Sequence, residues 1–461
     1  MGEGLNHGYL HKNAGIAHYL AHLVHQIGMS AFSYGDRAII RQHLLDALAA
    51  AFVGCRSKSF HDLAESCAVV PKGCPWPGSG SQRVHPLDSA MLWAFSINAS
   101  VFEDGSREGA CHPAAAIIPA VLSVSKGRSW NAIDKAIVAG YDVMVRMARG
   151  GNPEFTRKGF HPTAITAPFG AAVAASSILG HDWETTQHAI CLAALGCAGL
   201  MSSFRSGGTQ PLQVAWSTRS GVAAAMMAGA GHTGYDRIIE EGFYPAYLGR
   251  APFPPIEESL EYEYAIKGSY LKPYPGCRHI HPSIDALTEV LKRDKINPSQ
   301  IKEIRVGTYK VAVETEIHTV IKRGDAYFNI PYALAARLVL GRNDWDAFDE
   351  RHFSNQEIMA TMKKVKVEID PDMESRYPRQ RGSVVEVDVG KRKPLHGEIT
   401  CSLGEPENPV AFSLTIEKFR EAVAPFLSKK SRDRVEKIRD VSRLSDSAES
   451  LFEILSGNER A

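Results

Sequence analysis

Apolar residues recur at every third or fourth position over most of the first 250 residues of the chain. The segments "AIIRQHLLDALAAAFVG" (38–54), "AIDKAIVAGYDVMVRMARG" (132–150) and "PFGAAVAASSILG" (168–180) show this spacing, and each ends in glycine. The spacing matches one face of an α-helix, and glycine is common just after a helix ends. Alanine and glycine faces allow helices to approach closely. The pattern predicts a compact, almost wholly helical region.

The pattern changes after about residue 268, where valine and isoleucine begin to occupy alternate positions. Alternation of this kind predicts strands. The three alternating segments are "IKEIRVGTYKVAVE" (301–314), "KKVKVEIDP" (363–371) and "SVVEVDVG" (383–390). Helical spacing interrupts them and returns after "GEPENPV". We therefore expect a mainly α protein, with a helical domain (1–267 and 404–461) interrupted by a smaller α+β domain (268–403).

Composition narrows the class of partner. The chain has 461 residues, 44% of them hydrophobic, with 52 Lys and Arg against 51 Asp and Glu. A net charge near zero without basic runs argues against nucleic acid or a membrane surface as the main partner. Functional cations, if present, must act locally.

Cysteine usage and apolar runs indicate the compartment. Eight cysteines are scattered without a CxxC pair, so neither a disulfide framework nor a zinc knuckle is predicted. The N-terminal residues lack an apolar signal segment, and the longest apolar runs are broken by proline. These features predict a soluble, cytoplasmic protein.

Four histidines directly precede a proline at the start of a helical pattern: His85, His112, His161 and His281. Proline suits the first helical position, so each imidazole should lie near the positive end of a helix dipole. That field favours a neutral ring, which can serve as a general base. The alternative is a simple helix-start signal with an exposed ring, and His85, in a polar loop, is assigned to it.

The stretch "SYLKPYPGCRHIHP" (269–282) combines rigid prolines with Lys272, Arg278, His279 and His281. Fixed cations of this kind can bind a carboxylate, whereas the alternative is a stiff, solvated connector. A metal site at Cys277, His279 and His281 is disfavoured because a second ligand pair is missing. No metal is therefore predicted.

Two further features have ordinary structural interpretations. Asp142 and Arg146 are one helical turn apart and are expected to form an i,i+4 pair. The segment "SFRSGGTQ" (203–210), with Arg205, is expected to be a glycine-containing loop that could line a site.

Six motifs in order resemble the MmgE/PrpD family from about residue 15 to residue 425. They are "INASVFEDGSREGACHPAAAIIPA", "RKGFHPTAITAPFGAA", "GGTQPLQVAWSTRSGVAAAMMA", "YLKPYPGCRHIHPSIDA", "YFNIPYALA" and "GEPENPV". The resemblance implies a large all-α domain, a smaller α+β lid domain and a homodimer. It also implies chemistry at the carbon beside a carboxylate, without metal or organic cofactor.

The resemblance also implies individual site residues. They are His112 of "CHPAA", His161 of "GFHPT", the lid lysine Lys272 of "KPYP", the lid tyrosine Tyr332 of "NIPYALA", and Arg278 and His281 of "CRHIHP". Judged without the resemblance, Tyr332 would be a core aromatic with a satisfied hydroxyl more often than an acid.

The chain departs from the family pattern at several of these motifs. In "FEDGS", Phe102 stands where the decarboxylase has an aspartate, and Ser106 where it has a threonine. In "TQPLQ", Gln210 and Gln213 replace a lysine and a histidine. An amide can neither neutralise a carboxylate nor deliver a proton as an ammonium does. The departures argue against cis-aconitate decarboxylation, and Ser106 and Gln210 are retained as candidate substrate-binding residues.

Together these observations predict a lyase of the dehydratase type that acts on a di- or tricarboxylic acid. Proton removal beside a carboxylate builds negative charge, which Lys272 and Arg278 would offset. His112 and His161 would form the acid–base pair, with Tyr332 as proton donor and His281 beside the carboxylate. The alternatives are an epimerase, which returns the proton to the other face, and a binding protein that has lost activity.

Overall fold

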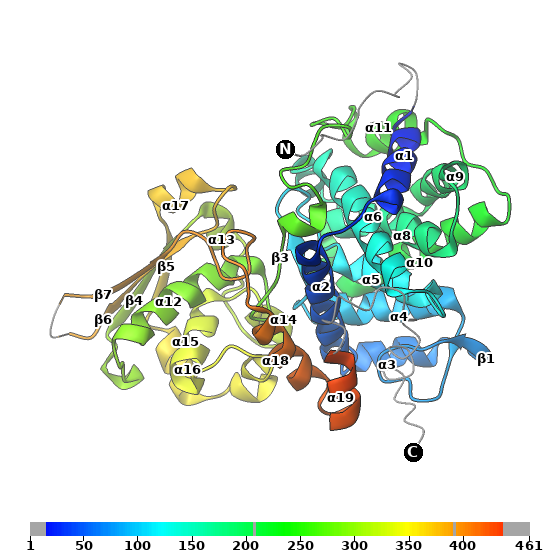
Figure 1. Cartoon of the computed structure of the whole chain (residues 1–461). Helices are drawn as coiled ribbons and strands as arrows, with labels where there is room; N and C mark the ends of the chain where they lie inside the picture. The colour runs from blue at the N-terminus through cyan, green and yellow to red at the C-terminus, as the bar shows by residue number, and fades with distance from the viewer. Residues whose placement is uncertain (1–14, 206–208, 391–392, 437–461) are drawn as a thin grey trace. The chain divides into compact units, whose positions relative to one another are not determined.

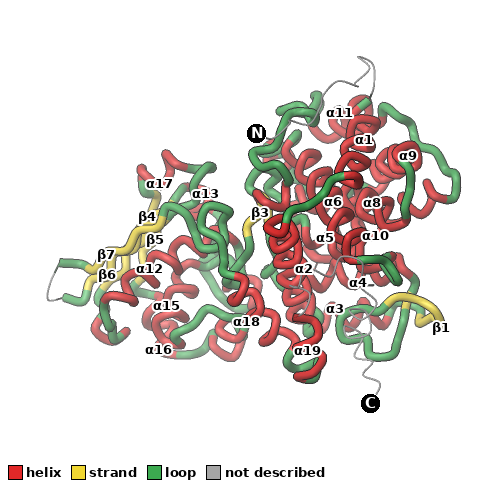
Figure 2. Tube along the Cα trace, in the orientation of Figure 1, coloured by secondary structure: helices red, strands yellow, loops and turns green. Residues whose placement is uncertain are grey.

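The computed structural model describes residues 15–205, 209–390 and 393–436, and most of this chain is helical. The prediction of a mainly α protein is confirmed (Figures 1 and 2). Residues 1–14, the centre of the 203–210 loop and the helical periodicity beyond residue 436 lie outside the described residues. The chain divides into two compact units, Met1–Ser269 with Thr415–Ala461 (unit 1) and Tyr270–Leu414 (unit 2).

Unit 1 is built almost entirely of helices, drawn in red in Figure 2. Its described helices are α1 (Ile16–Met29), α2 (Tyr34–Gly54), α3 (Lys58–Glu65), α4 (Pro86–Ala99), α5 (Ala114–Val124), α6 (Trp130–Arg149), α7 (Glu154–Arg157), α8 (Pro162–Leu179), α9 (Trp183–Ala193), α10 (Thr209–Gly229), α11 (Tyr244–Leu248), α18 (Phe412–Val423, which starts in unit 2) and α19 (Lys429–Glu436). Two short strands, β1 (Val69–Cys74) and β2 (Gly105–Ser106), accompany them, and β3 (Ser269–Tyr270) marks the boundary between the units.

Small residues allow the central helices of unit 1 to pack at close range. A Cβ atom at Gly170 of α8 would lie 2.5 Å from the Ile117 side chain of α5, and one at Gly140 of α6 would lie 2.7 Å from the same residue. A Cβ at Gly221 of α10 would lie 2.4 Å from the Pro168 carbonyl. These distances are too short for any larger side chain, so glycine at these positions is what allows α5, α6, α8 and α10 to form one core.

Helix α8 is long and apolar enough to cross a bilayer by composition alone. However, 89% of this 18-residue segment is buried inside the protein, as expected of a core helix. Helices α2 and α3 meet the same criterion only as a pair bent by 90°.

Unit 2 contains a four-stranded sheet with the order β5–β4–β6–β7. Its elements are α12 (His281–Arg293), β4 (Glu303–Thr308), α13 (Lys310–Glu314), α14 (Arg323–Ala326), α15 (Ile330–Leu340), α16 (Gln356–Met362), β5 (Val365–Ile369), α17 (Pro371–Arg376), β6 (Ser383–Asp388) and β7 (Leu395–Ile399). Strand β5 runs parallel to β4, and the other neighbours are antiparallel. Alternate residues of β6 are buried, as the alternating sequence predicts.

The strand prediction fails in one place. The alternation in "VGTYKVAVE" suggested a strand through residue 314, but β4 ends at Thr308 and residues 310–314 form the short helix α13. The backbone N–H of Lys310, at the start of α13, donates to the Glu374 carboxylate at 2.7 Å. A tertiary contact therefore stabilises a helical turn where local alternation favoured an extended chain.

The His-Pro pattern marks helix starts to within one residue. His85 and His161 are the N-cap residues of α4 and α8, each followed by proline at the first helical position. Helix α5 begins later than predicted, after Pro113, and α12 begins at His281 itself. His85 is exposed, and its Nδ1 accepts a hydrogen bond from the Leu87 N–H, as the helix-start interpretation requires.

A buried ion-pair cluster joins α2 to α6. Asp134 of α6 lies 3.0 Å from the Arg37 guanidinium and 2.7 Å from that of Arg41, both on α2. The Arg41 guanidinium also stacks 3.9 Å above the Trp130 ring. Because all three charged side chains are buried, each needs the others to offset its desolvation.

Asp142 and Arg146 do not form the predicted i,i+4 ion pair among the described contacts. Arg146 donates instead to the carbonyls of Ile256 and Glu258, at 2.9 and 2.7 Å, and Asp142 accepts from the Ala265 N–H at 3.3 Å. Both side chains thus tie α6 to the irregular segment that follows α11. Burial raises the pKa of Asp142 to about 7, although the Arg146 charge opposes the rise.

The raised pKa of Asp142 predicts a pH-dependent contribution to stability. A raised carboxyl pKa favours the protonated form in the folded state, so stability is gained as pH falls through about 7 and lost as pH rises. From about pH 8 to about pH 5, we expect wild type to gain roughly 2–3 kcal/mol relative to Asp142→Asn. Urea unfolding of both proteins at several pH values measures this difference. Parallel pH curves for the two proteins would contradict it.

Candidate functional site

His161 is buried at the start of α8, where its ring is oriented by Gln213 of α10. The His161 Nδ1 lies 3.1 Å from the Gln213 Nε2, and the Gln213 Oε1 accepts from the Leu200 N–H at 2.8 Å. Because that backbone N–H can only donate, it fixes which end of the amide faces the histidine. The amide N–H therefore donates to Nδ1, and the neutral ring carries its proton on Nε2.

The His161 ring is neutral at ordinary pH. Burial and, to a smaller extent, the nearby His112 lower its pKa to about 3. The ring is only 4% exposed and packs edge-on against Phe204, with ring centroids 5.1 Å apart. The neutral ring predicted from the helix dipole is thus explained chiefly by burial.

His112 is held in the opposite tautomer. Its Nδ1 lies 2.5 Å from the Asp104 carbonyl oxygen. Because a carbonyl oxygen can only accept a hydrogen bond, Nδ1 carries a proton, and in a neutral ring Nε2 is unprotonated. The His112 backbone N–H donates to the Thr163 hydroxyl at 3.1 Å, which brings His112 to the first turn of α8 beside His161. One imidazole can therefore accept a proton at Nε2 while the other can donate one.

The loop that carries Asp104 is fixed by buried contacts. The Asp104 carboxylate accepts from the Ala114 N–H at 3.0 Å, from the Tyr141 hydroxyl at 2.7 Å and contacts the His43 Nδ1 at 3.0 Å. An acid at the start of α5 is also favoured by the helix dipole. These contacts hold the Asp104 carbonyl where His112 requires it.

Lys418 of α18 holds the same loop from the other side. Its ammonium donates to the Phe102 carbonyl at 2.6 Å and to Asp46 at 2.6 Å, and it lies 3.6 Å above the Phe102 ring. The departure at Phe102 thus supplies an aromatic face for a buried cation.

Ser106 and Gln210 also lie in unit 1. Ser106 is buried, and its hydroxyl accepts from the Gly109 N–H at 3.3 Å, a contact within its own turn. The Gln210 amide donates to Asn98, which donates to Glu103 at 2.9 Å. Because Glu103 lies 4.0 Å from the His112 Nδ1, Gln210 is linked to the histidine through two side chains.

Gln213 is the functional residue that the sequence interpretation missed. It was treated as the loss of a charged group, but its amide orients His161 and also donates to the Ser203 hydroxyl at 2.7 Å. The available signal was its position on α10, three residues after Gln210 and hence on the same helical face.

Replacement of Gln213 by leucine is expected to lower kcat by about 10–100-fold, because the His161 ring loses the donor that fixes its tautomer. We expect KM and the melting temperature to stay nearly constant. The matched control is Gln26→Leu on the exposed part of α1. A change in KM alone, with kcat intact, would contradict a positioning role.

The cationic segment of unit 2 is more buried than a solvated connector would be. Lys272 is 2% exposed and Arg278 is 3% exposed. Arg278 donates to Glu405 at 3.0 Å, to the Leu403 carbonyl at 3.0 Å and to the Ser402 carbonyl at 3.4 Å. These donors serve the internal structure of unit 2, and the role of Arg278 as a carboxylate clamp stays a prediction.

The two histidines of this segment have internal partners as well. His281 is fully buried, and its Nδ1 accepts from the Arg278 guanidinium at 2.9 Å. His279 contacts the Tyr309 hydroxyl at 2.6 Å, and burial lowers its pKa to about 3. Across the described residues, no group of three or more His, Cys, Asp or Glu side chains has metal-binding geometry.

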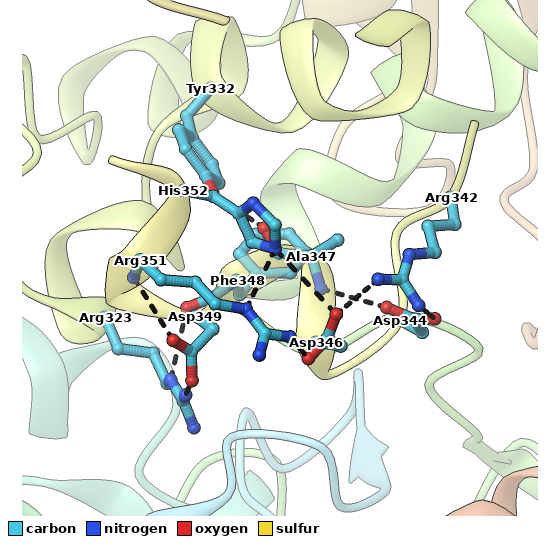
Figure 3. A network of polar contacts seen from close by, with 10 residues as sticks. All are labelled: Arg323, Tyr332, Arg342, Asp344, Asp346, Ala347, Phe348, Asp349, Arg351 and His352. Carbon is cyan, nitrogen blue, oxygen red and sulfur yellow. Dashed lines mark hydrogen bonds and ion pairs between the residues drawn. The ribbon is translucent and has the colours of Figure 1, made fainter. Parts of the chain in front are cut away.

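Tyr332 is part of a polar network within unit 2 (Figure 3). It is 1% exposed, and its hydroxyl donates to the Ala347 carbonyl at 2.6 Å. Burial raises its pKa, which disfavours loss of the proton. Figure 3 shows the ring beside a chain of ion pairs that includes Arg342 and Asp346. The hydroxyl is therefore satisfied internally, and the role of Tyr332 as a proton donor stays a prediction.

Comparison with known proteins gives matches over both units. The profile of the MmgE/PrpD N-terminal domain matches residues 18–256, and that of the C-terminal domain matches residues 274–444. A cis-aconitate decarboxylase from Aspergillus terreus is 24% identical over 298 residues, which is 60% of each chain. Human cis-aconitate decarboxylase is 24% identical over 367 residues, or 75% of each chain. A cis-aconitate decarboxylase-like protein from Aspergillus oryzae is 23% identical over 351 residues.

Proposed function

Because this chain belongs to the MmgE/PrpD family, we propose that it is a lyase of the dehydratase type acting on a di- or tricarboxylic acid. The supporting observation is the pair of imidazoles whose hydrogen bonds place a proton on Nδ1 of His112 and leave Nδ1 of His161 as an acceptor. Elimination of water needs one group that takes a proton from carbon and one that gives a proton to the leaving hydroxide.

In the proposed reaction, the unprotonated Nε2 of His112 takes the proton from the carbon beside the carboxylate. The electron pair of that C–H bond forms the alkene as the C–O bond breaks, and the departing hydroxide takes the Nε2 proton of His161 and leaves as water. The proton held by His112 then returns to the His161 imidazolate, which restores the starting state of both rings. Lys272 of unit 2 stabilises the negative charge that builds on the carboxylate oxygens. The role of unit 2 as a lid is part of this proposal, and no metal or organic cofactor is required in it.

Two other reactions use the same residues. Return of the proton to the opposite face would give epimerisation, and loss of carbon dioxide is the reaction named for the relatives. Gln210 and Gln213 disfavour decarboxylation, since neither amide supplies charge for the departing carboxylate. A cytoplasmic location remains a prediction.

A ligand screen followed by NMR in heavy water tests the function. A panel of di- and tricarboxylic acids is ranked by thermal shift, and a ligand at about 100-fold over its Kd should add roughly 2.7 kcal/mol of stability. Dehydration gives an ultraviolet-absorbing alkene, epimerisation gives deuterium exchange without one, and decarboxylation releases carbon dioxide. If no acid stabilises the protein or turns over, the proposal fails.

We also propose a homodimer that covers the apolar outer face of α10. Trp216 and Met227 are 57% and 46% exposed there, and Leu195 and Leu200, on adjoining turns, are 74% and 55% exposed. An apolar surface of this kind is typical of an interface. We expect sedimentation velocity to show a dimer at micromolar concentration, and a Trp216→Glu, Met227→Glu variant to be a monomer. A wild-type monomer would contradict this proposal.

A further inference from the structure

Arg381 lies in unit 2, between α17 and β6, where the backbone is held in place by its neighbours. The Gln380 N–H donates to the Arg376 carbonyl at 3.0 Å, and the Gly382 carbonyl accepts from the Thr308 hydroxyl at 3.0 Å. A Cβ at Gly382 would lie 2.6 Å from the Ile399 carbonyl, so the backbone here is tightly packed. The Arg381 side chain therefore extends from a fixed point.

Aromatic rings lie near the Arg381 side chain. Its guanidinium carbon lies 5.8 Å from the centre of the Tyr270 ring. Tyr309 and Tyr377 stack on each other with ring centroids 4.7 Å apart, and the Arg381 charge acts on both. His279, whose pKa burial lowers to about 3, is hydrogen-bonded to Tyr309. An aromatic face interacts with a guanidinium without using its in-plane N–H donors.

The donors of Arg381 are not satisfied by the part of the chain that the structure describes. The buried Nε has no hydrogen-bond partner there, and no ion pair of Arg381 is found among the same residues. Arg278, by contrast, has its donors engaged by Glu405 and two carbonyls. A buried N–H without an acceptor is costly, and such exceptions commonly mark a place where a ligand supplies the missing group.

Lys272 belongs to the same cluster. Burial raises the pKa of the Cys277 thiol, and a backbone hydrogen bond together with the charges of Lys272 and Arg381 opposes that rise. Both cations therefore lie within electrostatic reach of one thiol. The acid that acts on Arg381 is Glu405, whose Oε1 already accepts from Arg278.

We propose that the Arg381 guanidinium binds a carboxylate of the substrate, with Lys272 as the second cation. This inference rests on the proposed function for the chemical class of the ligand. A planar guanidinium can bind both oxygens of a carboxylate by parallel hydrogen bonds, which an ammonium cannot do.

Isothermal titration of the full chain with citrate, tricarballylate and succinate, at constant ionic strength, tests the assignment. Arg381→Met is expected to weaken the best-bound acid by at least about 30-fold, and Arg381→Lys by about 5–10-fold. The matched control is Arg379→Met, which removes an exposed charge from the same loop and should change affinity by less than about twofold. Circular dichroism checks that each variant is folded. If Arg381→Met does not fold, the comparison is made with Arg381→Lys instead.

The outcomes separate this inference from the proposed function. If wild type binds an acid and Arg381→Met binds it equally well, or Arg379→Met weakens it equally, the assignment of Arg381 is wrong while the function stands. If binding depends on Arg381 but a His161 variant turns over the acid normally, the assignment stands and the proposed chemistry fails. If none of the three acids binds wild type, both are overturned.

Discussion

Replacement of His161 by glutamine is expected to lower kcat by about 1,000-fold while leaving the binding of carboxylic acids nearly unchanged. General acid–base groups typically contribute about 100- to 10,000-fold to a rate, and glutamine keeps the size of the side chain but cannot donate a transferable proton. Steady-state turnover of the acid identified by the ligand screen measures the effect on kcat, and isothermal titration measures the binding.

The chain offers a closely matched control in His85. It too is an N-cap histidine followed by proline at the first helical position, but it is exposed and caps α4 with its Nδ1. His85→Gln should retain activity to within about twofold. Because the pKa of His161 is lowered to about 3, its protonation should not produce the acidic limb of the pH profile near neutrality. Equal losses in the two variants would contradict a catalytic role for His161.

The largest expected loss of stability comes from Asp134→Ala. The substitution leaves Arg37 and Arg41 buried without their acidic partner, and breaking a buried pair in this way typically costs about 3–5 kcal/mol. Guanidinium unfolding followed by near-ultraviolet circular dichroism measures the change in the free energy of unfolding.

Asp62→Ala is the control for this loss. The Lys58–Asp62 pair has the same 2.7 Å separation as Arg41–Asp134, but both of its side chains are exposed. Exposed pairs contribute about 0–1 kcal/mol, so this variant should unfold almost as wild type does. Similar losses in the two variants would show that burial does not set the strength of these contacts.

Much of the fold could be predicted from the sequence because the helices of unit 1 have regular apolar spacing. The small residues Gly140 and Gly170 also indicated the close helix packing that the structure contains. Prediction failed where tertiary contacts outweighed local pattern. Residues 310–314 alternate like a strand but form α13, and the short segment 395–399 lacks clear alternation but pairs along β6.

The candidate site was only partly predictable. His112, His161 and Lys272 stand out by motif, but the tautomers of the two histidines depend on the Asp104 carbonyl and the Gln213 amide, which only the folded chain brings to them. Arg278 carried the stronger sequence signal, whereas Arg381 lies in an unremarkable loop sequence. Which of the two has spare donors is decided by the position of Glu405, far away in the sequence.

The contact of Lys418 with the Phe102 carbonyl joins residues 316 positions apart, and this separation matters while the protein is being synthesised. At typical elongation rates of about 5–20 residues per second, roughly 15–60 s pass on the ribosome between the appearance of the two residues. During that interval the nascent helical body contains Asp46 without its cation, and the loop beside His112 lacks one of its anchors. The loop beside His112 can therefore reach its final geometry only after unit 2 and helix α18 have been translated.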